Sequence, residues 1–187
     1  MNIAILGTRG IPKNYGGFEQ NAENLGLQFV ARGHGVTVYN PDDHPYLEPE
    51  WKGIKIRRIF SREKKIGLLG SFIYDFLCLR DAVRQGFDVI LELGIPASLF
   101  YFLKKPQTRI VTNIDGLEWK RSKWNRWIKL YLKFLEKRTM GRSEAIITDN
   151  PGIQRYVKNT YGFTPYYIGY GAERDVVNKP RPEYLKE

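Results

Sequence analysis

The chain is poor in the residue types from which disulfides and metal sites are built, because its 187 residues include one cysteine and two histidines. Cys78 lies in an apolar stretch and has no partner for an internal disulfide, so we expect it to be an unreactive core residue. His34 and His44 lack cysteines or acids at the spacing of metal ligands. We therefore expect no protein-bound metal and no Cys-His or Ser-His-Asp catalytic set.

Long apolar runs are also absent. No run approaches the length of about 20 residues that spans a bilayer, and residues 1–4 lack the basic segment of a signal peptide. Together with the lone cysteine, these features predict a cytoplasmic protein. A chain of 187 residues with 42% hydrophobic content is long enough for one well-buried domain and short for two.

Two common nucleotide-binding signatures are missing near the start of the chain. Gly7 and Gly10 are spaced Gly-x-x-Gly rather than Gly-x-Gly-x-x-Gly, and the second predicted strand does not end in an acid that could hold a ribose hydroxyl. An NAD-dependent sugar-modifying enzyme is therefore a disfavoured alternative. Lys13 is followed by Asn14 rather than by Ser or Thr, which excludes ATP hydrolysis of the P-loop type.

A glycine-rich loop is present in their place. Gly7, Gly10, Gly16 and Gly17 lie between a short apolar strand and a helix predicted to begin near residue 18. Such a loop can be a flexible connection, or its backbone N–H groups can approach an anion. The Gly16-Gly17 pair at the entrance of the helix favours the second interpretation, because the helix dipole adds partial positive charge there. Phosphate or pyrophosphate is the expected ligand of this loop.

Charged side chains in the loop fit this interpretation. Arg9 lies between glycines at the end of the strand, so we favour it over Lys13 as a cation that neutralises a diphosphate. Glu19 would repel a phosphate, and we expect it instead to hold the loop by accepting from backbone N–H groups.

Strand-like and helical patterns alternate along the chain. This alternation predicts an α/β fold, a Rossmann-like three-layer sandwich with a mostly parallel sheet of about seven strands. Asn150 is expected to cap the last helix, with proline in its first turn. Residues 41–53 are interpreted as an exposed loop. The predicted strands are 2–6, 35–39, 54–59, 88–93, 108–113, 145–148 and 165–168, and the predicted helices are 18–32, 68–84, 96–103, 123–141 and 151–159.

Several segments together carry a family resemblance. They include Thr8-Arg9-Gly10-Ile11-Pro12 and Tyr15-Gly16-Gly17-Phe18-Glu19 in the first loop, followed by residues 113–121, 143–150 and 168–172. In these segments the chain resembles the amino-terminal domain of GT-B glycosyltransferases, more narrowly the rhamnosyltransferase-like members of family 4, often filed as a domain of unknown function. The resemblance covers nearly the whole chain.

The resemblance implies a function. It implies a sugar-nucleotide-dependent transferase of the retaining type in polysaccharide biosynthesis, which transfers a hexose such as rhamnose or glucose to a lipid-linked or polysaccharide acceptor. The sugar nucleotide is the donor substrate, and no further cofactor is expected. The chain is divided into a Rossmann-like acceptor-side domain, residues 1–172, and a polar linker, residues 173–187, toward an absent second domain. The isolated chain is therefore expected to be nearly inactive.

Candidate site residues follow the strand that ends at Asn113. Asp115 and Gly116 lie at the carboxyl edge of the sheet, where open α/β folds bind ligands, although Asp-Gly is also a common turn. By resemblance, Asp115 is the catalytic residue beside the transferred sugar. Glu118 either contacts acceptor or donor hydroxyls from the same loop or is a solvated carboxylate, and Gly116 belongs with it to the predicted substrate-binding set. Gly16, Gly17 and Arg9 complete the predicted substrate-binding set. Glu92 and Gly94 could line the same cleft.

One segment is strongly basic and aromatic. Residues 119–142 hold nine Lys or Arg residues and a single acid, Glu136, within a net charge of +10 for the whole chain. The helical stripe of Trp124, Trp127, Ile128, Tyr131, Leu132 and Leu135 is expected to pack on the sheet. The excess charge is not needed for packing, and Trp119, Trp124 and Trp127 suit a lipid headgroup interface, so the segment is predicted to dock peripherally on the anionic inner face of a membrane.

Two other functions remain open for this segment and for the chain. Nucleic acid could use the same patch, but no recognised nucleic-acid motif accompanies it, so this partner is disfavoured. The alternative from another class is a non-catalytic module that binds a membrane or a partner.

Overall fold

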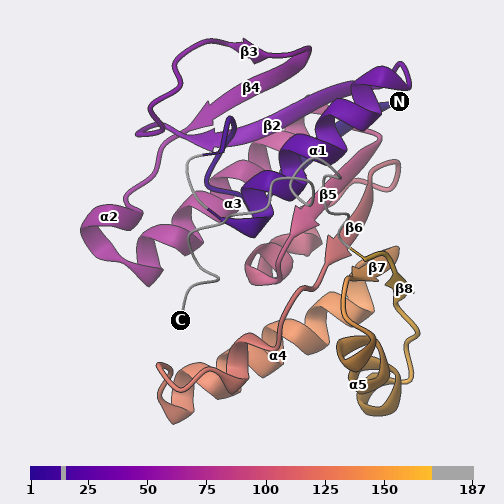
Figure 1. Ribbon diagram of the computed structural model, residues 1–187. Helices are drawn as coiled ribbons and strands as arrows, with labels where there is room; N and C mark the ends of the chain where they lie inside the picture. The colour runs from indigo at the N-terminus through magenta and orange to yellow at the C-terminus, as the bar shows by residue number, and fades with distance from the viewer. Residues whose placement is uncertain (14–15, 170–187) are drawn as a thin grey trace, which may run out of the picture.

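A computed structural model describes residues 1–13 and 16–169 of the chain. Its centre is an eight-stranded sheet in the order β3-β4-β2-β1-β5-β6-β7-β8, parallel throughout except for the pairing of β3 with β4 (Figure 1). The predicted three-layer Rossmann-like fold is confirmed. The strands are β1 (Asn2–Leu6), β2 (Gly35–Pro41), β3 (Glu50–Trp51), β4 (Ile54–Ile59), β5 (Val89–Leu93), β6 (Arg109–Asn113), β7 (Ala145–Thr148) and β8 (Tyr166–Tyr167).

Helices cover both faces of this sheet (Figure 1). Side chains alternate between the faces of a strand, so Ile3 and Ile5 of β1 pack in the cluster beneath α1, whereas Ala4 and Leu6 pack with α3 and η1. The Ser98 hydroxyl donates to the Leu135 carbonyl at 3.1 Å, which joins η1 to α4. The helices are α1 (Gly17–Ala31), α2 (Glu63–Ile66), α3 (Leu68–Gln85), η1 (Pro96–Leu103), η2 (Glu118–Lys120), α4 (Arg126–Arg142) and α5 (Pro151–Tyr161).

The predicted elements are all found, with shifts of one to a few residues at their ends. The 96–103 segment is a 3₁₀-helix, and α2 and η2 are short additions. The Asn150 side chain caps α5 by accepting from the N–H groups of Gly152 and Ile153, as predicted. Cys78 is buried, also as predicted.

Two expectations about local structure are wrong. The 41–53 segment is not entirely a loop, because Glu50–Trp51 forms the antiparallel edge strand β3 against β4. Trp127 does not pack on the sheet with the rest of its stripe, since 73% of it is exposed. Leu132 and Leu135 do pack there. The expected linker, 173–187, lies outside the described residues.

Candidate functional site

The direction in which successive strands are added to the sheet reverses between β1 and β5. From β1 the chain proceeds through α1 to β2 on one side, and from β4 it returns through α3 to β5 on the other side. The carboxyl ends of β1 and β5 therefore flank the topological switch point, where ligands of open α/β sheets bind. The loop after β1 begins there with Gly7, whose φ is +81°. A Cβ on Gly7 would lie 2.2 Å from the Leu93 carbonyl oxygen, so this glycine permits close packing of the loop on β5.

The two predicted glycines at the start of α1 differ in their surroundings. Gly16 is the residue before the helix and has a φ of 117°, which favours glycine. A Cβ on Gly17 would meet no heavy atom within 4 Å. Gly17 also lines a 620 Å³ cavity that runs beside α1 over the sheet, with Asn113 of β6 and apolar side chains such as Leu91 and Val111. The space at Gly17 is therefore accessible to a ligand.

The Glu19 carboxylate holds the loop in place. It accepts a hydrogen bond from the Arg9 backbone N–H at 2.7 Å, which confirms the structural role expected for this acid. Glu23, one turn further along α1, accepts from the Lys13 N–H. The first helix thus ties down the loop from one side.

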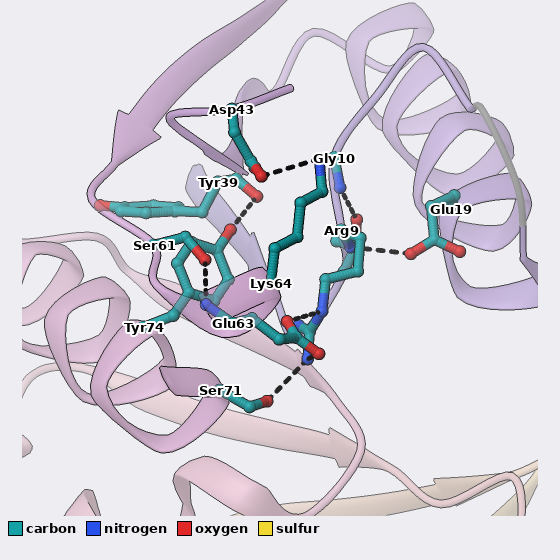
Figure 2. A network of polar contacts seen from close by, with 11 residues as sticks. Arg9, Gly10, Glu19, Tyr39, Asp43, Ser61, Glu63, Lys64, Ser71 and Tyr74 are labelled. Atoms are coloured by element: carbon teal, nitrogen blue, oxygen red, sulfur yellow. Dashed lines mark hydrogen bonds and ion pairs between the residues drawn. The ribbon is translucent and has the colours of Figure 1, made fainter. Parts of the chain in front are cut away.

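Arg9 ties the loop to the other side of the molecule. Its guanidinium pairs with Glu63 of α2 at 2.6 Å, donates to the Ser71 hydroxyl at 2.7 Å, and lies 5.7 Å from the centre of the Tyr74 ring (Figure 2). The predicted diphosphate-binding cation is therefore engaged within the protein, although 42% of its side chain is exposed. Its role in donor binding stays a prediction.

Two buried acids accompany Arg9, and sequence reasoning assigned neither of them to this place. Asp75 of α3 is 4% exposed. Burial raises its pKa to about 7, although the positive charge of Arg9 lowers it in part. Glu92 of β5 is 1% exposed, and burial, followed by the charge of Asp75, raises its pKa well above the ordinary value. Neither carboxyl oxygen of Glu92 has a hydrogen-bond partner among the described residues. Glu92 therefore does not line a cleft, which corrects the expectation for it.

A second cavity, of 370 Å³, opens between the first loop and the end of β2. Arg9 and Gly10 of the loop and Glu19 of α1 line it from one side, and His44 and Lys64 line it from the other side. Figure 2 shows the polar groups around it, including the ion pair of Lys64 with Asp43 at 2.8 Å. Burial lowers the pKa of His44. This cavity offers both donors and acceptors of hydrogen bonds.

The predicted catalytic aspartate lies in an acidic group at the end of β6. Asp115 is exposed, yet partial desolvation and then the nearby charges of Asp149 and Glu118 raise its pKa. Glu118 forms an ion pair with Arg121 at 2.8 Å. A Cβ on Gly116 would meet no heavy atom within 4 Å, so the loop has free space beside it. A carboxylate here can bind hydroxyls or stabilise positive charge.

The structure therefore groups the predicted site residues into three places. Asp115, Gly116 and Glu118 belong to one loop at the edge of the sheet, with Asp149 of the β7–α5 connection as an unpredicted neighbour. Gly16 precedes α1 and Gly17 begins it, and Arg9 is directed toward Glu63 and Ser71. Among residues 1–13 and 16–169, no set of three or more His, Cys, Asp or Glu side chains is arranged to hold a metal ion.

Solved structures share this architecture. Sucrose-phosphate synthase from Thermosynechococcus elongatus aligns over 96% of this chain and 53% of its own, with a TM-score of 0.72 and 13% identity. Arabidopsis thaliana UGT89C1, solved with UDP, aligns over 92% of this chain and 50% of its own, with a TM-score of 0.58 and 11% identity. A kitacinnamycin glycotransferase aligns over 97% and 55%, with a TM-score of 0.52 and 18% identity.

These likenesses define the class of fold. The chain has the Rossmann-like fold of one half of a GT-B glycosyltransferase, and it spans about half the length of these three proteins. The model of the domain of unknown function DUF1972 matches residues 1–173, so the chain belongs to that family. No curated protein sequence matches the chain.

Proposed function

We propose that the chain is the acceptor-side half of a sugar-nucleotide-dependent glycosyltransferase, retaining and rhamnosyltransferase-like, that transfers a hexose such as rhamnose or glucose. The acceptor is a lipid-linked sugar or a polysaccharide. The observation that carries the proposal is the position of Asp115, in a fold shared with glycosyltransferases, at the sheet edge on the carboxyl side of β6 next to β5. Ligands of open parallel sheets bind at that edge.

Each predicted site residue has a role in this proposal. The backbone at Gly16 and Gly17 approaches the donor diphosphate, since the open space at Gly17 admits a ligand where the dipole of α1 is positive. Asp115 stabilises the positive charge that develops on the sugar ring, or orients the acceptor hydroxyl. Gly116 leaves room for the substrate, and Glu118 accepts from its hydroxyls. Arg9 adds positive charge from the far side of the loop.

Donor binding can be tested at Gly17. The longest polypeptide that contains this chain is screened by thermal shift against UDP-, GDP- and dTDP-sugars, because a ligand of the folded state raises the melting temperature. UDP-sugars come first, since UGT89C1 was solved with UDP. We expect one nucleotide class to raise the melting temperature, and Gly17→Val to abolish that shift. Gly141→Val, at another site with open space for a Cβ, is the matched control and should retain it.

Three outcomes separate the hypotheses. A shift that Gly17→Val and Gly141→Val both retain would remove Gly17 from the donor site. Absence of any shift across the panel would favour the non-catalytic module. Turnover by the 187-residue chain alone at about 1 per second or more would show that the site needs no second domain.

The lipid-linked acceptor gives the basic helix a role. A transferase whose acceptor remains in a bilayer works at the membrane surface, and α4 carries the charge that would hold it there. Every helix in the described part of the chain is too short or too polar to span a bilayer.

A further inference from the structure

We propose that a defined surface of α4, made of the apolar row Trp127, Leu130 and Phe134 and the cations around it, inserts into the interface of an anionic bilayer. This deepens the proposed function by naming its membrane contact. This row differs from the apolar stripe predicted from the sequence, because Trp127 lies on the side of α4 that faces solvent. Binding to vesicles is measured without any sugar transfer. A result against the membrane surface can therefore be distinguished from a result against the proposed enzyme activity.

The row faces away from the protein. Trp127, Leu130 and Phe134 are spaced by three and four residues, so they lie on one side of the helix. Their exposed fractions are 73%, 51% and 49%. Leu132 and Leu135 occupy the opposite side and are 7% and 0% exposed, in the cluster that joins α4 to the rest of the fold. The helix therefore has one apolar side in the core and a second in water.

The charge around this row is of one sign. The structure describes every residue of 119–142, and its single acid, Glu136, is 1% exposed and accepts hydrogen bonds from the hydroxyls of Tyr156 and Tyr161. Glu118, just before the segment, pairs with Arg121 at 2.8 Å, and no exposed carboxylate within 119–142 offsets the other cations. The exposed cations of the segment are Lys120, Arg121, Lys123, Arg126, Lys133, Lys137 and Arg142.

Cations lie directly beside the apolar side chains. The Arg126 guanidinium is 5.6 Å from the centre of the Trp127 ring, and the Arg138 guanidinium is 5.7 Å from the Phe134 ring. Lys123 lies 4.4 Å from the ring of Trp124, just before the helix. An indole or phenyl ring at the depth of the lipid headgroups, with a cation at its edge near the phosphates, is the arrangement that interfacial helices use.

The position of α4 in the fold allows a flat surface to reach it. Figure 1 shows α4 along the lower border of the molecule, its long axis running across the view. The row covers about two turns of the helix. Each Lys or Arg near an anionic bilayer contributes on the order of 1 kcal/mol. Four such cations and the row together are enough for reversible attachment.

Binding to vesicles tests this surface. The chain is sedimented with phosphatidylcholine vesicles and with vesicles of phosphatidylcholine and phosphatidylglycerol at 3:1. We expect at least tenfold tighter binding to the anionic vesicles, and a blue shift of tryptophan fluorescence that Trp127→Phe largely removes. The triple variant Trp127→Ser, Leu130→Ser, Phe134→Ser should weaken binding at least tenfold. Leu47→Ser, at a leucine that is 70% exposed on another loop, is the matched control and should bind normally.

Charge is tested separately. Lys133→Glu with Lys137→Glu should weaken anionic binding at least tenfold, whereas the control pair Lys55→Glu with Lys158→Glu, which changes the net charge equally, should weaken it much less. Equal binding of wild type to neutral and anionic vesicles would overturn the proposal, as would a triple variant that binds like wild type. Tighter binding to a single-stranded oligonucleotide than to anionic vesicles would assign the surface to nucleic acid instead.

Discussion

The Nε atom of Arg9 lies 2.6 Å from a carboxylate oxygen of Glu63, 54 residues further along the chain, and this ion pair fastens the first loop to α2. On the other side of the loop, Glu19 of α1 accepts from the Arg9 backbone N–H. The loop that leads to Gly16 and Gly17 is therefore held from both layers of helices. The backbone N–H groups of Arg9, Gly10, Ile11 and Lys13 all donate to side chains of the protein, so these restraints fix the loop itself.

The contact of Glu19 with the loop can be tested by substitution. Glu19→Ala removes the acceptor of the Arg9 N–H and should lower the free energy of unfolding by about 1–2 kcal/mol. Glu19→Gln keeps an acceptor oxygen and should cost less than half as much. Urea unfolding measures both variants. Equal losses in the two variants would mean that the hydrogen bond to the loop is not what Glu19 contributes.

Close packing of the loop on β5 predicts that Gly7 tolerates no side chain. Gly7→Ala combines a positive φ with a Cβ 2.2 Å from the Leu93 carbonyl oxygen. Gly33→Ala is the matched control, because Gly33 has nearly the same φ, +78°, and no heavy atom within 4 Å of the added carbon. We expect about 1 kcal/mol of destabilisation at Gly33 from strain alone, and about 1–3 kcal/mol more at Gly7. Similar melting temperatures for the two variants would contradict the close approach.

The buried Asp75 predicts a dependence of stability on pH. Its pKa is raised from 3.8 to about 7, so the folded chain holds a proton that the unfolded chain has already lost between these values. The contribution of Asp75 is therefore most favourable below pH 4 and declines until pH 7. Asp75→Asn removes this titration.

The measurement compares unfolding free energies at pH 5 and pH 8. From pH 5 to pH 8, the free energy of unfolding of Asp75→Asn should rise relative to that of the wild type by on the order of 3 kcal/mol, at about 1.4 kcal/mol per pKa unit. A difference between variant and wild type that is the same at both pH values would mean that Asp75 does not titrate in this range.

The fold could be predicted from the sequence because it depends on local patterns. Short apolar runs such as 2–6 and 145–148 fit buried parallel strands, and Asn150 before Pro151 marks the start of α5 through a cap within three residues. β3 was missed because Glu50–Trp51 has two residues, too few to show a strand period, and the hairpin depends on pairing with β4.

Much of the site required the tertiary structure. The partners of Arg9 come from α2 and α3, so no local pattern links them. Asp75 lies on an apolar helix, where an acid is usually taken for a solvated residue, and its depth depends on the packing of α3 against β1. Trp127 and Ile128 are successive residues about 100° apart on a helix, so the predicted stripe was wider than the buried side. Trp127 was expected to suit a lipid headgroup interface, but its neighbours in the exposed row, Leu130 and Phe134, were not identified.

The most direct test of the proposed function is transfer of a radiolabelled hexose from its nucleotide to lipid extract by the longest polypeptide that contains this chain. We predict transfer from one nucleotide class, and a loss of at least 100-fold in Asp115→Asn with an unchanged melting temperature. Glu48→Gln, at an exposed loop carboxylate, is the control and should remain fully active. Transfer by Asp115→Asn at the wild-type rate, or none from any sugar nucleotide by the wild-type protein, would contradict the proposal.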